Sequence, residues 1–257
     1  MSAIEVIAGG LEFPEGPTVA DDGSIWFSEL RAGRLGHLRD GSLHRHIVGG
    51  APNGTALGHD GAVWFCDAER CQVRRLDPLT GEVSVMIDAI DGVPLDAPND
   101  LAFHPDGSLV FTCPGSSRSE PTGYLATLHP DGTVARSAEG LLFPNGVCFS
   151  EDRSSVFLAE TYGCRVLEAR WGESLDFSPL FATTGPIGAD GVAAARGRVH
   201  STVYGGASIR TLDLGRELTK DTAVPDAHPA GCAADPLGRW DLIVTGAATG
   251  VLLGVKL

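Results

Sequence analysis

Three short motifs in the sequence place an oxygen-bearing side chain directly before a glycine. Glu15 lies in a Pro-Glu-Gly-Pro motif, Asn145 in Pro-Asn-Gly and Asp190 in Ala-Asp-Gly. Asn and Asp before glycine commonly form turns, but turn chemistry gives no reason for the Glu. If the three side chains converge, the two carboxylates repel each other unless a cation or raised pKa values compensate. Carboxylate and amide oxygens suit Ca²⁺ first and then Mg²⁺ or Mn²⁺, whereas Zn²⁺ usually recruits His or Cys.

The same position recurs in six copies of one sequence pattern. Each copy has an apolar segment, a turn such as Asp-Gly and a second apolar segment such as Ile-Trp-Phe, which is typical of a β-hairpin. The aligned column contains Glu15, Asn53, Asn99, Asn145, Asp190 and Ala230, at spacings of 38, 46, 46, 45 and 40 residues. This spacing is typical of propeller blades.

Two further strands follow the clear hairpins, so each repeat supplies a four-stranded antiparallel blade. The pattern predicts an all-β fold, a six-bladed β-propeller formed by residues 1–257 as a single domain. Residues 3–8 form a spare strand that we expect to pair with the strand of residues 250–257 and close the ring. A β-sandwich is the alternative, but six hairpins at near-equal spacing favour radial repetition.

In a propeller the innermost strands line the central channel, so the aligned column should converge at one end of it. We therefore predict one divalent metal ion, Ca²⁺ foremost with Mg²⁺, Mn²⁺ or Zn²⁺ as alternatives, bound by Glu15, Asn145 and Asp190. Asn53 and Asn99 share the column, so the ligand set could include four or five oxygens. A free coordination position would polarise a carbonyl or phosphoryl oxygen and activate water, which indicates a hydrolase-type site.

Composition narrows the possible partners. The chain has 257 residues, 43% of them hydrophobic, and a net charge of −14, which disfavours nucleic acid as a partner. No run of about 18 apolar residues and no basic, apolar leader is visible, so we expect a cytoplasmic protein that does not enter membranes. The six cysteines are expected to be reduced thiols packed in strands, with a Cys66–Cys71 bridge as a minor alternative.

These motifs, in this order, resemble the senescence marker protein (regucalcin), gluconolactonase and luciferin-regenerating enzyme family of six-bladed propellers. The resemblance implies that Glu15, Asn145 and Asp190 bind the metal and that Asn99 contacts the substrate or its water. It also implies that Asp190 is the general base when water attacks a lactone carbonyl, so that the protein hydrolyses a small lactone. Many sugar lactonases of the family carry an Arg two residues before the third-copy Asn, where this chain has Ala97.

Other readings stay open on the same scaffold. The site could hydrolyse phosphotriesters, as in the related diisopropyl fluorophosphatase, or serve a lyase or isomerase step. A non-catalytic propeller that binds Ca²⁺ and partner proteins is the alternative from another class. As a hydrolase, the protein would bind a small-molecule substrate and exist as a monomer or small homo-oligomer.

A few further residues are candidates outside the column. We expect Asn53, Asn99, Arg118 and His228 to contact the substrate, Arg118 through an anionic group. His44 and His46 alternate on a predicted outer strand, where solvated edge positions are favoured over a surface metal site. Trp26 and Trp64 occupy matched hairpin positions and are predicted to lie in the blade cores.

Overall fold

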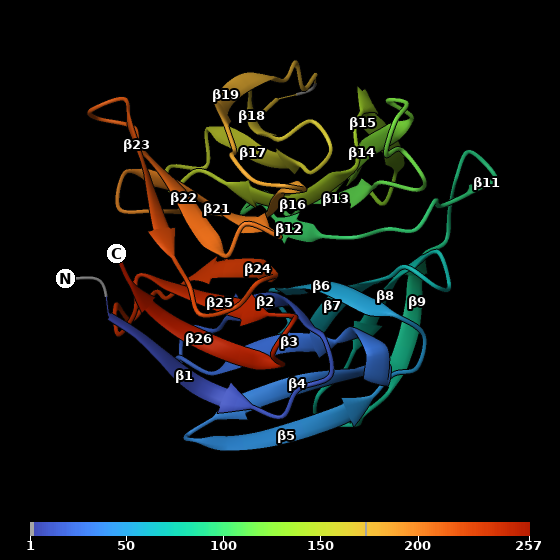
Figure 1. Cartoon of the computed structure of the whole chain (residues 1–257). Helices are drawn as coiled ribbons and strands as arrows, with labels where there is room; N and C mark the ends of the chain where they lie inside the picture. The colour runs from blue at the N-terminus through green and yellow to red at the C-terminus, as the bar shows by residue number, and fades with distance from the viewer. Residues whose placement is uncertain (1–2, 173) are drawn as a thin grey trace.

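The computed structural model describes residues 3–172 and 174–257, which form a ring of sheets around a central axis (Figure 1). Within these residues there are six four-stranded antiparallel sheets, one short hairpin of β10 (Ala89–Ile90) and β11 (Val93–Pro94), and one 3₁₀ turn, η1 (Leu30–Ala32). The predicted all-β, six-bladed propeller is confirmed. In the described ranges, no helix is long and apolar enough to cross a membrane.

The first three blades follow the chain in order, each from its inner to its outer strand. They consist of β2 (Pro14–Val19), β3 (Ile25–Glu29), β4 (Arg34–Arg39) and β5 (Ser42–Ile47); β6 (Pro52–Leu57), β7 (Val63–Asp67), β8 (Gln72–Leu76) and β9 (Val83–Ile87); and β12 (Leu101–Phe103), β13 (Leu109–Cys113), β14 (Gly123–Leu128) and β15 (Val134–Leu141). Inner strands of neighbouring blades contact each other, as β2 does β6.

The remaining blades complete the ring. They consist of β16 (Pro144–Phe149), β17 (Ser155–Glu160), β18 (Arg165–Arg170) and β19 (Ser178–Ala182); β20 (Gly188–Ala195), β21 (Arg198–Tyr204), β22 (Ser208–Asp213) and β23 (Leu218–Ala223); and β24 (Pro229–Ala234), β25 (Leu242–Gly246), β26 (Val251–Lys256) and β1 (Ala3–Gly9). The last blade joins both ends of the described chain, because β1 pairs antiparallel with β26 from Ala3 opposite Lys256 to Gly9 opposite Val251 (Figure 1). The predicted closure of the ring is confirmed.

Turn chemistry explains the hairpins that join the first two strands of each blade. The glycines of the Asp-Gly turns, Gly23, Gly61 and Gly107, have φ values of 80°, 79° and 96°, in the region that glycine adopts without a steric penalty. The fifth copy has no Asp-Gly turn in sequence. It turns instead at Arg196 and Gly197, both with positive φ, between β20 and β21.

Side chains of the second strands fill the spaces between blades. Phe27, Phe65, Phe111 and Phe157 occur on successive second strands and are at most 1% exposed. Each such ring contributes roughly 1.5–3 kcal/mol by burial. Trp26 is buried as predicted, whereas Trp64 is only partly buried and packs edge-on against Phe103. All six cysteines are free thiols, so the alternative bridge does not form.

Buried carboxylates at the ends of three second strands hold the segments that lead into inner strands. Each carboxylate is fully buried and forms an ion pair with at least one arginine. Each also accepts a hydrogen bond from a backbone N–H group, and the residue that donates it lies two or three positions before a member of the aligned column. The pairs are Glu29 with Glu12 (2.9 Å), Asp67 with Ala51 (3.1 Å) and Glu160 with Leu142 (2.6 Å). These charge-assisted contacts fix where each inner strand begins.

Candidate metal centre

The aligned column lies where the inner strands begin. Glu15, Asn53, Asn145 and Asp190 lie near the starts of β2, β6, β16 and β20, and Asn99 just precedes β12. Beyond the column residue, the pairing of β2, β6, β16, β20 and β24 with the second strand shifts by one residue. Such a bulge adds one residue to the inner strand and re-aims its side chains.

Glycines at the bulges bring the inner strands together at the axis. A Cβ atom on Gly16 would lie 2.3 Å from the Cα atom of Gly54, and one on Gly146 or Gly191 would lie 2.8 Å from the Cα atom of the next glycine around the ring. A Cβ atom on Gly231 would lie 2.7 Å from the backbone nitrogen of Gly16. Because these contacts are with backbone, only glycine fits, and the side chains just before the glycines gather around the axis.

The third blade departs from this rule, since Asp100 replaces the glycine. Its carboxylate occupies the axis: Oδ1 lies 2.1 Å from where a Cβ atom on Gly54 would be, and Oδ2 accepts a hydrogen bond from the backbone N–H of Val147 at 3.0 Å. Asp100 was not among the site residues predicted from the sequence. The signal was present, because Asp100 is the non-glycine member of a column that is glycine in the other five copies.

A short hydrogen-bond chain orients Asn145. The hydroxyl of Thr161 donates its hydrogen to the carbonyl of Ala189 at 2.7 Å and therefore accepts from Nδ2 of Asn145 at 3.1 Å. The side chain of Asn145 also lies close enough to Asp190 to lower the pKa of its carboxyl. The amide nitrogen thus faces these partners, which leaves the carbonyl oxygen available to a ligand.

The site concentrates negative charge away from water. Burial, and next the charge of Asp190, raise the pKa of Glu15 well above its usual value. Burial, and next the charge of Asp100, raise the pKa of Asp190 to about 7, although the side chain of Asn145 opposes this change. Burial also raises the pKa of Asp100 to about 6, against the backbone hydrogen bonds from Val147 and Leu101.

These residues fit a divalent cation by their chemistry. Within the described ranges, Glu15, Asp100 and Asp190 form no ion pair with a Lys, Arg or His, so their charges lack a counterion from the chain. The same ranges contain no group of three His, Cys, Asp or Glu side chains arranged to hold a metal ion. A bound ion would therefore need amide oxygens, which Asn145, Asn53 and Asn99 can supply.

Two predicted substrate contacts lie beside the column rather than in it. The guanidinium of Arg118 is exposed and lies 5.8 Å from the ring centres of both Phe143 and Tyr162. The imidazole of His228 stacks on Tyr204 with ring centres 4.7 Å apart. The side-chain amides of Asn53 and Asn99 form no hydrogen bond within the described chain, so both are free for a substrate or water.

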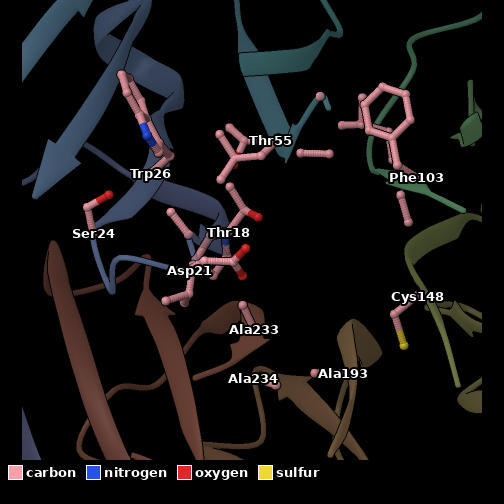
Figure 2. A pocket seen from close by; sticks show the side chains of 18 of the residues that line it. Thr18, Asp21, Ser24, Trp26, Thr55, Phe103, Cys148, Ala193, Ala233 and Ala234 are labelled. Atoms are coloured by element: carbon pink, nitrogen blue, oxygen red, sulfur yellow. The ribbon is translucent and has the colours of Figure 1, made fainter. Parts of the chain in front are cut away.

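A hollow of about 1140 Å³ lies on the other side of the glycine ring. Figure 2 shows it between Trp26, Thr55, Phe103 and Cys148, and Asp100 also lines it. Its wall comes from the later halves of inner strands and from hairpin turns, so it opens at the face opposite the aligned column. Mostly small and aliphatic side chains surround its inner part, and the described residues that line it include no group arranged to hold a metal ion.

His44 and His46 lie at the rim of that hollow, on β5. His44 is exposed, as expected for an edge strand, but His46 is partly buried with its ring centre 5.3 Å from that of Trp26. The neighbouring His37 stacks on Trp26 at 3.9 Å. The cluster is therefore packed against an aromatic ring rather than simply solvated.

Comparison with known proteins agrees with the fold and the motifs. A family model for the SMP-30/Gluconolactonase/LRE-like region matches residues 13–248. A gluconolactonase from Zymomonas mobilis is 29% identical over 202 residues, which cover 69% of this chain and 56% of that protein. The chain thus spans little more than half the length of that relative.

Solved structures show the same architecture. A gluconolactonase from Xanthomonas campestris superposes with a TM-score of 0.87 at 22% identity, covering 100% of this chain and 90% of its own. Regucalcin from Agrobacterium tumefaciens, a calcium-binding protein, superposes with a TM-score of 0.79 at 19% identity, covering 98% and 92%. At these identities the structures establish the fold alone. The family model spans every residue of the aligned column, and the chain belongs to the SMP-30/gluconolactonase/LRE-like family.

Proposed function

We propose that this protein is a metal-dependent hydrolase of small lactones. The observation that carries the proposal is the group of buried carboxylates without a counterion among the described residues, gathered with amide oxygens where the inner strands begin. Family membership and the similarity to gluconolactonases support the lactone as substrate. The similarity to a calcium-binding regucalcin supports Ca²⁺ as the first metal to test.

Glu15, Asn145 and Asp190 would hold the cation, with Asn53 and Asn99 as further oxygen donors. When bound, a divalent ion supplies Lewis acidity that stabilises negative charge on a substrate oxygen. Thr161 holds Asn145 in the orientation that leaves its carbonyl oxygen available. The glycine ring fixes the spacing of the side chains around the axis.

Asp190 acts as the general base in this proposal, and Asn99 orients the substrate or the attacking water. A carboxylate oxygen of Asp190 takes a proton while the water oxygen bonds to the lactone carbonyl carbon. The bond between that carbon and the ring oxygen then breaks, and the proton returns to the leaving oxygen. The product is an open-chain hydroxy acid.

Turnover of lactones with and without metal tests the proposal. Chelator-treated protein should lose hydrolysis of aldonolactones and recover it with one of Ca²⁺, Mg²⁺, Mn²⁺ or Zn²⁺. Asp190→Asn should reduce kcat by at least about 100-fold, the lower range for loss of a general base. Asp40→Asn, at a 95% exposed carboxylate, is the matched control and should keep full activity. Equal rates for metal-free and metal-loaded protein would refute the mechanism.

Adding aliphatic lactones and phosphotriesters to the substrate panel separates the other readings. Preferential turnover of phosphotriesters would assign the same residues to phosphorus chemistry. Tight Ca²⁺ binding without turnover of any panel member would favour a lyase, an isomerase or a non-catalytic binding protein. Each of these outcomes would overturn lactone hydrolysis.

A further inference from the structure

Tyr204 departs from a pattern that the ends of the second strands share in other blades. In three blades the last residue of the second strand is a buried carboxylate that faces the proline at the start of the inner strand; these residues are Glu29, Asp67 and Glu160. In the fifth blade the same position, opposite Gly188, holds Tyr204, which is partly exposed. A tyrosine cannot form the ion pairs that the three carboxylates form, so this position has another role in the fifth blade.

Tyr204 lies on the side of the site where the aligned column has no polar side chain. The sixth member of the column is Ala230 on β24, and β24 packs between β20 and β2, which carry Asp190 and Glu15. The strand of Tyr204, β21, also packs against β24. Its partner in the sheet, Gly188, precedes Asp190 by only two residues. Tyr204 therefore borders the gap between the two carboxylates.

His228 fixes the orientation of the tyrosine ring. Its imidazole stacks on Tyr204 with ring centres 4.7 Å apart and an angle of 17° between the two planes. The backbone N–H of His228 donates a hydrogen bond to the buried carboxylate of Asp226 at 2.7 Å, and that carboxylate also accepts hydrogen bonds from Thr249. Stacked aromatic side chains restrict each other's orientation. Tyr204 is thus held between its own strand and a histidine that is itself anchored.

The hydroxyl of Tyr204 lies within electrostatic reach of the site. Burial, and next the charges of Asp190 and Glu15, raise the pKa of Tyr204 above its usual value of about 10, while the charge of Arg31 acts in the opposite direction. Among the described residues, no group forms a hydrogen bond with this hydroxyl. The phenol is therefore protonated at neutral pH, and its proton is available to a molecule bound at the aligned column.

We propose that Tyr204 is the catalytic acid of the lactone hydrolysis, and that its hydroxyl gives a proton to the ring oxygen as the bond from that oxygen to the carbonyl carbon breaks. This inference rests on the proposed function and adds the group through which a proton reaches the leaving oxygen. Asp190 takes a proton from the attacking water, and Tyr204 gives one to the leaving alkoxide. Solvent water then carries the proton from Asp190 to the phenolate. The net reaction adds one water to the lactone.

Two six-membered lactones with different leaving groups test the inference. δ-Valerolactone expels an alkoxide, which is about as basic as hydroxide and needs a proton as it leaves. Dihydrocoumarin expels a phenolate, whose conjugate acid has a pKa of about 10, so a catalytic acid contributes little. Tyr204→Phe keeps the stacked ring and removes only the hydroxyl. It should lower kcat for δ-valerolactone by at least about 100-fold and kcat for dihydrocoumarin by less than about threefold.

Tyr162→Phe is the matched control, because Tyr162 is also an accessible tyrosine but packs edge-on against Phe143 in the fourth blade. It should change neither rate. His228→Ala removes the ring that orients Tyr204 and should lower kcat about 2- to 10-fold for δ-valerolactone only, whereas His228→Phe should retain the rate because it keeps a stacked ring. Equal losses on both lactones in Tyr204→Phe would show that the tyrosine supports only folding or binding, and would overturn the inference.

A spectroscopic measurement tests the place of the hydroxyl without turnover. The chain has three tyrosines, Tyr124, Tyr162 and Tyr204, so protein labelled with 3-fluorotyrosine gives three fluorine signals that Tyr→Phe variants assign. Saturating Ca²⁺ should lower the pH midpoint of the Tyr204 signal, because the ion compensates the charges of Asp190 and Glu15. Asp190→Asn should lower that midpoint in metal-free protein.

The two measurements separate this inference from the proposed function. A midpoint of Tyr204 that changes neither with Ca²⁺ nor in Asp190→Asn would overturn the inference even if both lactones were hydrolysed. Failure of the wild type to hydrolyse either lactone would overturn the proposed function itself, and the inference with it.

Discussion

Removal of divalent cations should make the stability of this protein fall as the pH rises, and Asp190 should account for much of the fall. The pKa of Asp190 is raised from the usual 3.8 to about 7 in the folded protein. Between these values the folded state keeps a proton that the unfolded state has already released. The free energy of unfolding therefore decreases with rising pH in this window and becomes level above it.

The size of this effect follows from the shift. By pH 5 the unfolded carboxyl is ionised, and each further pH unit up to about 7 then lowers the free energy of unfolding by about 1.4 kcal/mol. The loss between pH 5 and 8 is thus on the order of 3 kcal/mol for Asp190. Glu15 and Asp100 contribute in the same direction, because their pKa values are also raised.

Three histidines change the free energy of unfolding with pH in the opposite direction, so their contribution must be separated from that of Asp190. Burial lowers the pKa of His200 to about 4, and the pKa values of His37 and His46 are lowered as well. These groups make the protein more stable as the pH rises toward their ordinary value of 6.5. A comparison with Asp190→Asn cancels them, since that variant keeps all three histidines.

The assay is urea unfolding of metal-free protein at pH 5, 6, 7 and 8, with and without added Ca²⁺. We expect the stability of the wild type relative to Asp190→Asn to fall by about 3 kcal/mol from pH 5 to pH 8. Ca²⁺ at about 100 times its Kd should stabilise the wild type at pH 8 by about 2.7 kcal/mol and the variant by less. Parallel pH profiles for the two metal-free proteins, or equal stabilisation by Ca²⁺, would refute the electrostatic account of the site.

Three further changes test how the scaffold supports the site. Gly146→Ala should destabilise the fold by about 1–3 kcal/mol in urea unfolding, because the added Cβ would lie 2.6–2.8 Å from backbone atoms of the next blade. The control Gly215→Ala should be nearly neutral, because its added Cβ would have its nearest contact at 3.6 Å. Thr161→Val should weaken cation binding by about 10-fold in calorimetry, while Thr183→Val, which removes a buried hydroxyl without a partner, should leave it unchanged. Deletion of residues 1–10 removes β1 and should lower Tm and cause concentration-dependent association in light scattering, because β26 becomes an edge strand; a monomeric deletion variant with unchanged Tm would contradict this.

Much of the architecture was predictable because the sequence repeats the same strand and turn pattern in each blade. The Asp-Gly turns and alternating strands predicted the hairpins, and the column from Glu15 to Ala230 predicted which side chains surround the axis. Turn residues and periodicity are sufficient to predict these features, since every blade packs against its neighbours in the same way. The fifth blade lacks the Asp-Gly turn in its sequence, yet it forms the same four-stranded sheet, because the other five blades leave space in the ring for one more.

Features that depend on contacts between distant residues were not predictable in the same way. Asp100 was visible as an odd residue in a glycine column, but its place at the axis emerges only when the inner strands meet. The role of Thr161 requires knowing that its hydroxyl lies between Asn145 and the carbonyl of Ala189.

The pairing of β1 with β26 has a consequence for how the molecule forms. The first described strand to be synthesised finds its partner only when the last one is complete, so the final blade joins segments separated by nearly the whole chain. Closing a loop of that length costs roughly 5 kcal/mol in chain entropy, which places this step late and makes it slow. Until then β1 is a free strand and β26 an exposed edge. Once the ring is closed, no blade can separate without losing its contacts with both neighbouring blades, so the ring should unfold as a unit. The lifetime of the folded protein in the cell should then depend on the rate at which the β1–β26 pairing of the last blade opens.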